Sequence, residues 1–253
     1  EEFLDPELDA ARISGLPMGL EYAVFKNFDE RLHSVAPVSI PKDEKTGRPK
    51  DVTLYMGMDP HDARPSFILW LAVFKPDDIG VSKKRVYMES FDKSTHNIEE
   101  EAGLVKALET NCGLPRRRVI DPNFGPKTYR NTGRTVMQEW AIAGRKINWP
   151  IYFTPGNDNV ELGHDAIRKA LANRCLDGSA ELAVCETCPR LLDALRYYAV
   201  NPKTGNVDAH NPYKHAIDTL RYVMMLKPRY IDPAEDEGVA DTEPYVPDEV
   251  TGY

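Results

Sequence analysis

Three segments rich in apolar and β-branched residues follow one another in the first half of the chain. Residues 52–59 and 85–91 have the composition of strands, and residues 66–75 form a nearly continuous apolar run that is typical of a buried strand. The segments between them are rich in residues that favour turns, such as Pro, Asp and Gly. The pattern predicts an antiparallel meander of three strands.

After the meander, helical periodicity alternates with short apolar runs. The helix predicted at residues 95–111 has a candidate cap at Thr95 or Asn97, acids in its first turns and an apolar face. The other predicted helices are residues 135–144 (ended by Gly144), 159–175, 188–200 and 212–226, and the other predicted strands are residues 116–123, 148–156 and 181–185. This order predicts an α/β fold with a mixed central sheet flanked by helices. The order is similar to the ribonuclease H-like (resolvase/integrase-type) arrangement, for which the acids described below are the stronger evidence.

Composition divides the chain of 253 residues into three parts. Residues 1–50 form an irregular lead-in with a short predicted strand within residues 19–35, residues 51–231 carry the regular pattern, and residues 232–253 form a tail. The tail holds eight acids and neither Lys nor Arg, so it accounts for the whole formal charge of −8. We expect it to be disordered or to be a docking segment. The rest of the chain is formally neutral, so the overall acidity does not argue against nucleic acid as a partner.

Composition also argues against several protein classes. No run approaches the roughly 18 apolar residues of a membrane span, and the acidic N-terminal stretch lacks the features of a signal peptide. The four cysteines are too few and too irregularly spaced for a disulfide-stapled fold. Cys185 and Cys188 form a Cys-x-x-Cys pair, for which Cys175, His164 or His210 would have to complete a zinc site. The pattern favours instead a strand that ends where a helix begins.

Three acids lie at positions that suit a metal site. Two predicted strands end with a hydrophobic residue, Asp and Pro, which places Asp59 and Asp121 at strand ends. If these strands are parallel neighbours, both carboxylates lie at one edge of the sheet, and the last predicted helix can bring Asp218 there, with His215 on the same helical face. Clustered carboxylates repel one another unless cations lie between them, and hard oxygen ligands suit Mg²⁺ or Mn²⁺. The acids therefore predict a centre for phosphodiester hydrolysis.

Each of these residues also has a structural interpretation. An Asp before Pro is common in turns, and His215 could be hydrogen-bonded beside the site without a chemical role. Glu89 lies in the middle of a predicted strand, where we expect it to face solvent; the alternative is a fourth metal ligand. Basic residues near the acids predict a path for DNA phosphates, or else a solvated surface. They are Arg116, Arg117, Arg118, Lys127, Arg130, Arg134, Arg145, Lys146 and Lys214.

The segment KHAIDTLRY, residues 214–222, resembles the closing helix of the nuclease domain in the large terminase subunits of tailed phages, the motors that package DNA. That family has an acid or His, two residues, and then Asp-Ala-Leu-Arg-Tyr; this chain has His215 and Asp218 there, with Thr219 where Ala is usual. The GMDP and VIDP strand ends are similar to the family's two metal-acid strands. With the lead-in, which resembles the joint between ATPase and nuclease, the resemblance covers residues 15–228.

One departure from the family concerns its motor half. The phosphate-binding string GxxxxGK[ST] does not occur in this sequence, and the first residue is not Met. We therefore expect the C-terminal nuclease half alone, without ATP hydrolysis.

The resemblance implies a hydrolase, a Mg²⁺- or Mn²⁺-dependent endodeoxyribonuclease that cuts concatemeric viral DNA during genome packaging with little sequence specificity. In the expected mechanism Asp59 bridges two ions, Asp121 and Asp218 each hold one, and His215 binds metal or transfers a proton. The implied partners are double-stranded DNA, the portal protein and the small terminase subunit, and no membrane. We expect a monomer in isolation, an oligomer in the full motor, and a location in the host cytoplasm, transiently at the procapsid portal.

Two other functions are open from the sequence. A Holliday-junction resolvase or transposase of the same fold would share the acids but prefer branched or end-specific DNA. A non-catalytic interaction domain would have the acids as turn residues and would bind no divalent metal.

Overall fold

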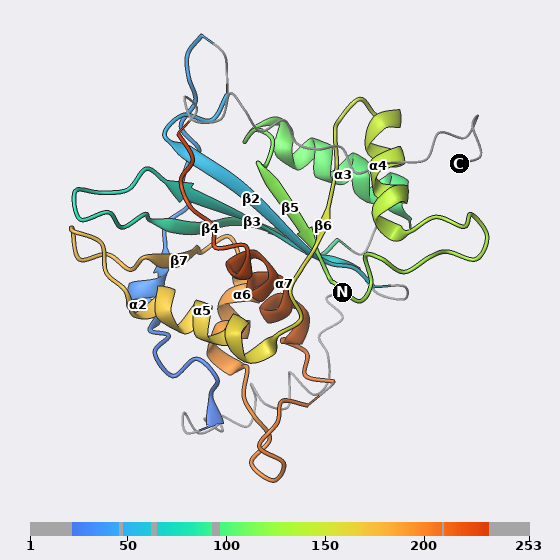
Figure 1. The fold of residues 1–253 in the computed structure, drawn as a ribbon. Coiled ribbons are helices and arrows are strands. Elements are labelled where there is room, and N and C mark those ends of the chain that lie inside the picture. The colour runs from blue at the N-terminus through green and yellow to red at the C-terminus, as the bar shows by residue number, and fades with distance from the viewer. Residues whose placement is uncertain (1–21, 46–47, 62–64, 93–96, 209, 233–253) are drawn as a thin grey trace, which may run out of the picture.

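In the computed structural model, the residues that the structure describes are 22–45, 48–61, 65–92, 97–208 and 210–232. Their centre is a seven-stranded sheet in the order β1-β7-β4-β3-β2-β5-β6 (Figure 1). The strands are β1 (Ser34–Val35), β2 (Val52–Asp59), β3 (Phe67–Phe74), β4 (Lys84–Ser90), β5 (Arg117–Ile120), β6 (Thr154–Pro155) and β7 (Leu182–Cys185). The helices are α2 (Glu30–His33), α3 (Ile98–Thr110), α4 (Val136–Lys146), α5 (Val160–Ala172), α6 (Pro189–Tyr197) and α7 (Lys214–Met225).

The central strands have the order and direction that the sequence predicts. β2, β3 and β4 pair antiparallel as a meander, and β5 extends the sheet parallel to β2. β6 pairs parallel with β5, and β7 pairs parallel with β4. The mixed sheet and its ribonuclease H-like order are therefore confirmed. β2 ends at Asp59 as predicted, because Pro60 has no N–H group to continue the ladder.

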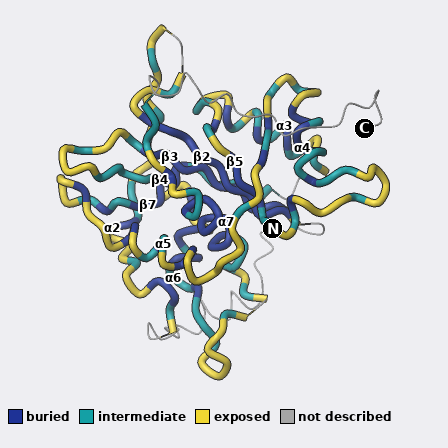
Figure 2. The backbone as a smooth tube through the Cα atoms, viewed as in Figure 1, coloured by how far each residue is buried: buried dark blue, intermediate teal, exposed yellow. Residues whose placement is uncertain are grey.

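Helices cover both faces of the sheet (Figure 1). Side chains alternate along β3: Leu69 and Leu71 pack with residues of α5, α6 and α7, whereas Ile68 and Trp70 pack with residues of α3 and α4. Figure 2 shows the strands buried between these two helical layers. The alternation explains the continuous apolar run in the sequence, since both sides of β3 face a core.

Part of the lead-in belongs to this fold. Phe25 is 2% exposed within the core on the α7 side, and β1 pairs parallel with β7. The short strand predicted within residues 19–35 is therefore present, preceded by α2. Residues 1–21 and the acidic tail after Asp232 lie outside the described residues.

The start of α3 and the end of α4 test the helix boundaries predicted from the sequence. α3 begins after Asn97, whose side chain accepts a hydrogen bond from a backbone N–H of the first turn, while Thr95 lies outside the described residues. The prediction that Gly144 ends α4 is wrong: the helix continues to Lys146, because a glycine inside a helix costs only about 1 kcal/mol. Within the described ranges, no helix combines the length and apolar character that crossing a membrane requires.

Candidate active site

Asp59 and Asp121 lie side by side at the C-terminal ends of two parallel strands. β2 and β5 pair in register up to Met58 and Ile120, so the next residue on each strand is the acid. The backbone N–H of Asp121 donates to the carbonyl oxygen of Met58 over 3.0 Å, which extends the ladder to the acids. Neighbouring strands lie about 4.8 Å apart. The structure therefore brings both carboxylates to one edge of the sheet.

α7 lies across the same end of the sheet and carries the third acid. Gly57 of β2 leaves room for the helix: a Cβ atom at this position would lie 2.5 Å from Cγ2 of Val223 and 3.0 Å from the backbone oxygen of Thr219. This close approach brings the first turns of α7, with His215 and Asp218, to the ends of β2 and β5. A glycine two residues before Asp59 thus helps to assemble the site.

Asp59 is buried and bonded to His215. Its Oδ2 lies 2.6 Å from Nδ1 of His215, and the Asp59 side chain is 8% exposed against 33% for His215. Burial raises the pKa of Asp59, the bond to His215 lowers it in part, and the charges of Asp121 and Asp218 raise it further. The electrostatics at Asp59 therefore favour an additional positive charge.

Asp121 is held by its own loop and by α7. Its Oδ1 accepts hydrogen bonds from the backbone N–H groups of Asn123 and Phe124 at 2.6 and 2.9 Å, which is the turn chemistry of an Asp before Pro. Its Oδ2 accepts a hydrogen bond of 2.9 Å from the hydroxyl of Tyr222. Burial, and then the nearby acids, raise the pKa of Tyr222 well above its usual value, so the hydroxyl keeps its proton and donates. Asp121 is a turn residue and part of the acid cluster at once.

Asp218 is paired with two cations of its own helix. Its Oδ2 accepts from Nζ of Lys214 at 2.6 Å, and its Oδ1 accepts from Nε and Nη2 of Arg221 at 3.2 and 3.1 Å. Arg221 is 2% exposed, and its Nη1 donates to the carbonyl oxygen of Asn157 in the loop before α5. Gly163 of α5 makes room for this side chain, since a Cβ atom there would lie 1.9 Å from Cγ of Arg221. Arg221 thus fixes Asp218 and ties α7 to α5.

The donor set fits a hard divalent cation, and more directly at Asp59 and Asp121 than at Asp218. The first two acids offer adjacent carboxylates whose side-chain partners are a histidine and a hydroxyl. Both oxygens of Asp218 are paired with Lys214 and Arg221. In the part of the chain that the structure describes, no group of three His, Cys, Asp or Glu side chains is arranged to hold a metal ion. A centre that includes all three acids would place a divalent cation beside the two cations that Asp218 already binds.

The Cys-x-x-Cys pair lies away from these acids. Cys185 ends β7 and Cys188 is the N-cap residue of α6, and both are buried free thiols. This is the strand end followed by a helix that the sequence favours. His164, a candidate zinc ligand, packs instead edge-on against the rings of Phe25 and Tyr198.

Glu89 is half-buried rather than turned to solvent, which corrects the expectation for this residue. Its two carboxylate oxygens accept hydrogen bonds from the backbone N–H groups of Arg190 and Leu191, at 2.8 and 3.0 Å, in the first turn of α6. Burial raises the pKa of Glu89, and these two bonds lower it in part. A carboxylate is stabilised at a helix N-terminus, so Glu89 serves as a cap of α6.

Arg118 is buried, so the prediction that it contacts DNA is wrong. Its side chain is 6% exposed, and its Nη2 donates to Oε2 of Glu109 at 2.7 Å in the core between β5 and α3. The reason is the alternation of a strand, which turns Arg118 inward while Arg117 is exposed. The other basic residues stay predicted DNA contacts: Arg116, Arg117, Lys127, Arg130, Arg134, Arg145, Lys146 and Lys214.

Sequence reasoning assigned no role to Arg221 and Tyr222, which the structure hydrogen-bonds to two of the acids. A signal was present, because they follow Asp218 by three and four residues and so share its helical face. His61, near the end of β2, was also missed. Its ring meets that of His215 edge-on, with the centroids 5.7 Å apart.

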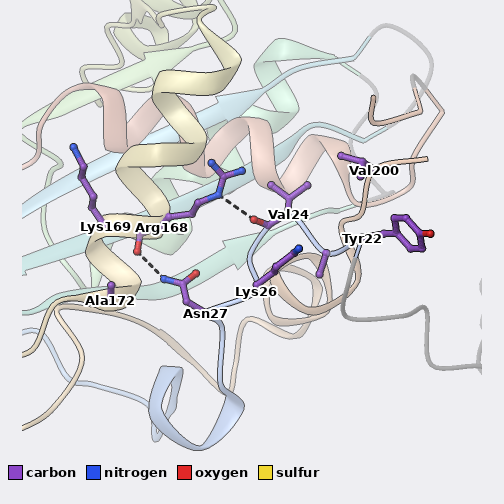
Figure 3. Close-up of a pocket in the computed structure, with 9 residues that line it drawn as sticks. Tyr22, Val24, Lys26, Asn27, Arg168, Lys169, Ala172 and Val200 are labelled. Atoms are coloured by element: carbon purple, nitrogen blue, oxygen red, sulfur yellow. Dashed lines mark hydrogen bonds between the residues drawn. The ribbon is translucent and has the colours of Figure 1, made fainter. Parts of the chain in front are cut away.

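A pocket of about 630 Å³ lies apart from the acids, between the lead-in and α5 (Figure 3). Arg168 of α5 crosses it, because its Nε donates to the carbonyl oxygen of Val24 while its own carbonyl oxygen accepts from Nδ2 of Asn27. None of the three acids lines this pocket. Its contacts attach the lead-in to α5.

The fold is similar to that of phage large terminases. It aligns with the large terminase of a thermophilic bacteriophage with a TM-score of 0.57 at 14% identity, over 79% of this chain and 44% of that chain. With the nuclease domain of the P22 large terminase the TM-score is 0.56 at 16% identity, over 81% of this chain and 92% of that domain. This chain thus spans less than half of the thermophilic phage's protein but has the fold of the P22 nuclease domain. Neither the protein-family models nor the curated proteins that were compared match the sequence.

Proposed function

We propose that this chain is a metal-dependent endonuclease that cuts concatemeric viral DNA during genome packaging. The observation that carries the proposal is the register of β2 and β5, which sets Asp59 beside Asp121 where α7 brings Asp218. The fold that holds these acids is that of a phage terminase nuclease domain. Buried acids that exceed their local counter-charges are typical of functional sites.

In this proposal Asp59, Asp121 and Asp218 would hold the catalytic Mg²⁺ or Mn²⁺ ions, two of them by the expected mechanism. Such ions, when bound, supply activation of water and stabilisation of the leaving oxygen of a phosphodiester. The protein's own contribution is to fix the carboxylates beforehand. His215 holds Oδ2 of Asp59, and Tyr222 holds Oδ2 of Asp121.

The proposed substrate is double-stranded DNA, cut with little sequence preference. Exposed basic residues follow Asp121 on the loop between β5 and α4, where Lys127 and Arg130 would contact phosphates. His215, which is bonded to Asp59, has 33% of its side chain exposed, so the site opens to solvent beside Asp59, where a phosphate would approach. As part of a large terminase the chain would work with the portal protein and the small terminase subunit, as an oligomer, in the host cytoplasm and transiently at the procapsid.

Cleavage of supercoiled plasmid tests this function. Wild type should nick and linearise the plasmid in Mn²⁺ or Mg²⁺ and not in EDTA. Asp121→Asn should abolish cleavage, because Asn retains an oxygen for the backbone bonds of the turn but lacks the charge. The matched control is Asp78→Ala in the exposed turn between β3 and β4, which should cut like wild type.

Three results would contradict the proposal. Equal cleavage by wild type and Asp121→Asn would show that the activity does not depend on this acid. Cleavage that persists in EDTA would show that it does not depend on a metal ion. Absence of both cleavage and Mn²⁺ binding in the folded wild-type protein would favour a non-catalytic domain.

A further inference from the structure

Lys214 is placed where a helix does not favour a cation. It is the first residue of α7, whose N-terminus carries a partial positive charge, and the first turn of α7 contains no acid. A Lys four residues before an acid is also the weaker orientation of such a pair in a helix. Stabilisation of α7 therefore does not explain the 2.6 Å contact between Nζ of Lys214 and Oδ2 of Asp218.

Lys214 and His215 are neighbours in the first turn of α7, and each binds one of the acids. Nζ of Lys214 donates to Oδ2 of Asp218, and Nδ1 of His215 lies 2.6 Å from Oδ2 of Asp59. The ammonium is thus a positive charge at Asp218, next to the residue that is bonded to Asp59.

The two cations on Asp218 are held with different firmness. Arg221 is 2% exposed, and its guanidinium also donates to the carbonyl oxygen of Asn157. The Lys214 side chain is 43% exposed and has a flexible stem that can carry the ammonium into water. Displacing Arg221 would take a buried guanidinium from its nearest carboxylate and leave it only Asp158, at 3.8 Å, whereas a displaced Lys214 can turn to water. Lys214 is therefore the exchangeable partner of Asp218.

We infer that Lys214 is a resident counter-ion for Asp218, which a divalent cation displaces when it binds. This inference rests on the proposed metal-dependent function and adds to it a residue that sets the affinity for metal. Without metal, Lys214 keeps the buried carboxylate neutralised. With a divalent cation bound, Asp218 would no longer need the ammonium as its counter-charge, and Lys214 would be available to a DNA phosphate.

Calorimetric titration of the full chain with Mn²⁺ tests the inference. Lys214→Met should bind Mn²⁺ about ten-fold more tightly than wild type, which corresponds to the loss of one competing charged hydrogen bond. Its melting temperature should be lower than that of wild type in EDTA and should rise more on addition of Mn²⁺. Lys214→Arg, which keeps the cation, and Lys169→Met, on the exposed surface of α5, should both resemble wild type.

The outcomes separate the inference from the function on which it rests. If wild type binds Mn²⁺ and cuts DNA but Lys214→Met binds Mn²⁺ no more tightly, the counter-ion role is wrong and the nuclease stands. If neither folded protein binds Mn²⁺, both proposals fall. If Lys214→Met is unfolded in EDTA, Mn²⁺ should restore its fold, and failure to do so would overturn the inference.

Discussion

Buried charge is arranged differently on the two faces of the sheet. On the face covered by α3 and α4, Glu109 and Arg118 are 0% and 6% exposed and form an ion pair. The indole N–H groups of Trp70 and Trp149 donate to the two oxygens of Glu109, at 3.0 and 2.7 Å. Glu109 is therefore paired with one base, and its other lone pairs accept hydrogen bonds from two neutral donors.

On the face covered by α7, three acids face two permanently charged bases, and both of these bases bind Asp218. Asp218 takes both the lysine and the arginine of α7, and Asp59 is left with His215 and a raised pKa. Asp121 is held by neutral donors alone. Part of this cluster also reaches solvent, whereas the charged groups of Glu109 and Arg118 do not. Burial of an acid therefore does not by itself indicate a functional site; an excess of acids together with access from solvent is the better indication.

The largest expected effect on stability comes from removing the charge of Glu109, the buried partner of Arg118. Glu109→Gln should lower the free energy of unfolding by about 3–5 kcal/mol, because it leaves the buried Arg118 without a counter-charge. The matched control is Glu99→Gln on the same helix, whose exposed pair with Lys146 should contribute less than about 1 kcal/mol. Urea denaturation measures both. A small effect of Glu109→Gln would show that the comparison between the faces is mistaken.

An intermediate effect is expected from crowding Arg221. Gly163→Ala should destabilise the protein by about 1–3 kcal/mol and reduce cleavage about 10²-fold, because the new Cβ displaces the side chain that positions Asp218. Gly103→Ala in α3 is the control: a Cβ there meets no atom within 4 Å, so stability should rise by about 0.5–1 kcal/mol. Unchanged cleavage by Gly163→Ala would show that Arg221 does not position Asp218 for cleavage.

The smallest effect is expected at Asp77, an acid outside both clusters. Hydrogen bonds from the backbone N–H of Leu176, and then of Val81 and Ile79, lower its pKa below the usual 3.8. Because the folded-state pKa is lowered, the stabilisation is present above pH 3.8 and is lost as the pH falls through the folded value. Asp77→Ala should therefore melt slightly below wild type at pH 7, and the difference should shrink as the pH falls below 3.8. A difference that grows with acid would contradict this assignment.

The strands and their acids were predictable because the signals are local. A segment with strand composition that ends in Asp and Pro defines β2, and the same ending follows β5, so Asp59 and Asp121 could be placed at strand ends before any pairing was known. The helix of Asp218 was predictable from its periodicity. These features depend on residues that are close in sequence.

The bonding partners of Arg118 and Glu89 were not predictable in the same way. The bonds of Arg118 to Glu109 and of Glu89 to α6 join segments that meet only in the folded chain, and both residues carry charges that usually face water. Sequence patterning therefore placed them on the surface. Alternation along β5 would have turned Arg118 inward, but a run of three arginines hides that alternation.

Replacement of Asp59 tests the central claim, that the α7 face holds excess acids for function rather than for stability. Asp59→Asn keeps the size of the side chain and removes its charge. On the same preparation, plasmid cleavage would be measured in Mn²⁺ and urea unfolding in EDTA. We predict that cleavage falls to background while the free energy of unfolding is equal to or greater than that of wild type, since burial raises the pKa of Asp59 and disfavours its ionised form. A protein that still cuts but has lost stability would show that Asp59 belongs to the scaffold, and would contradict the account.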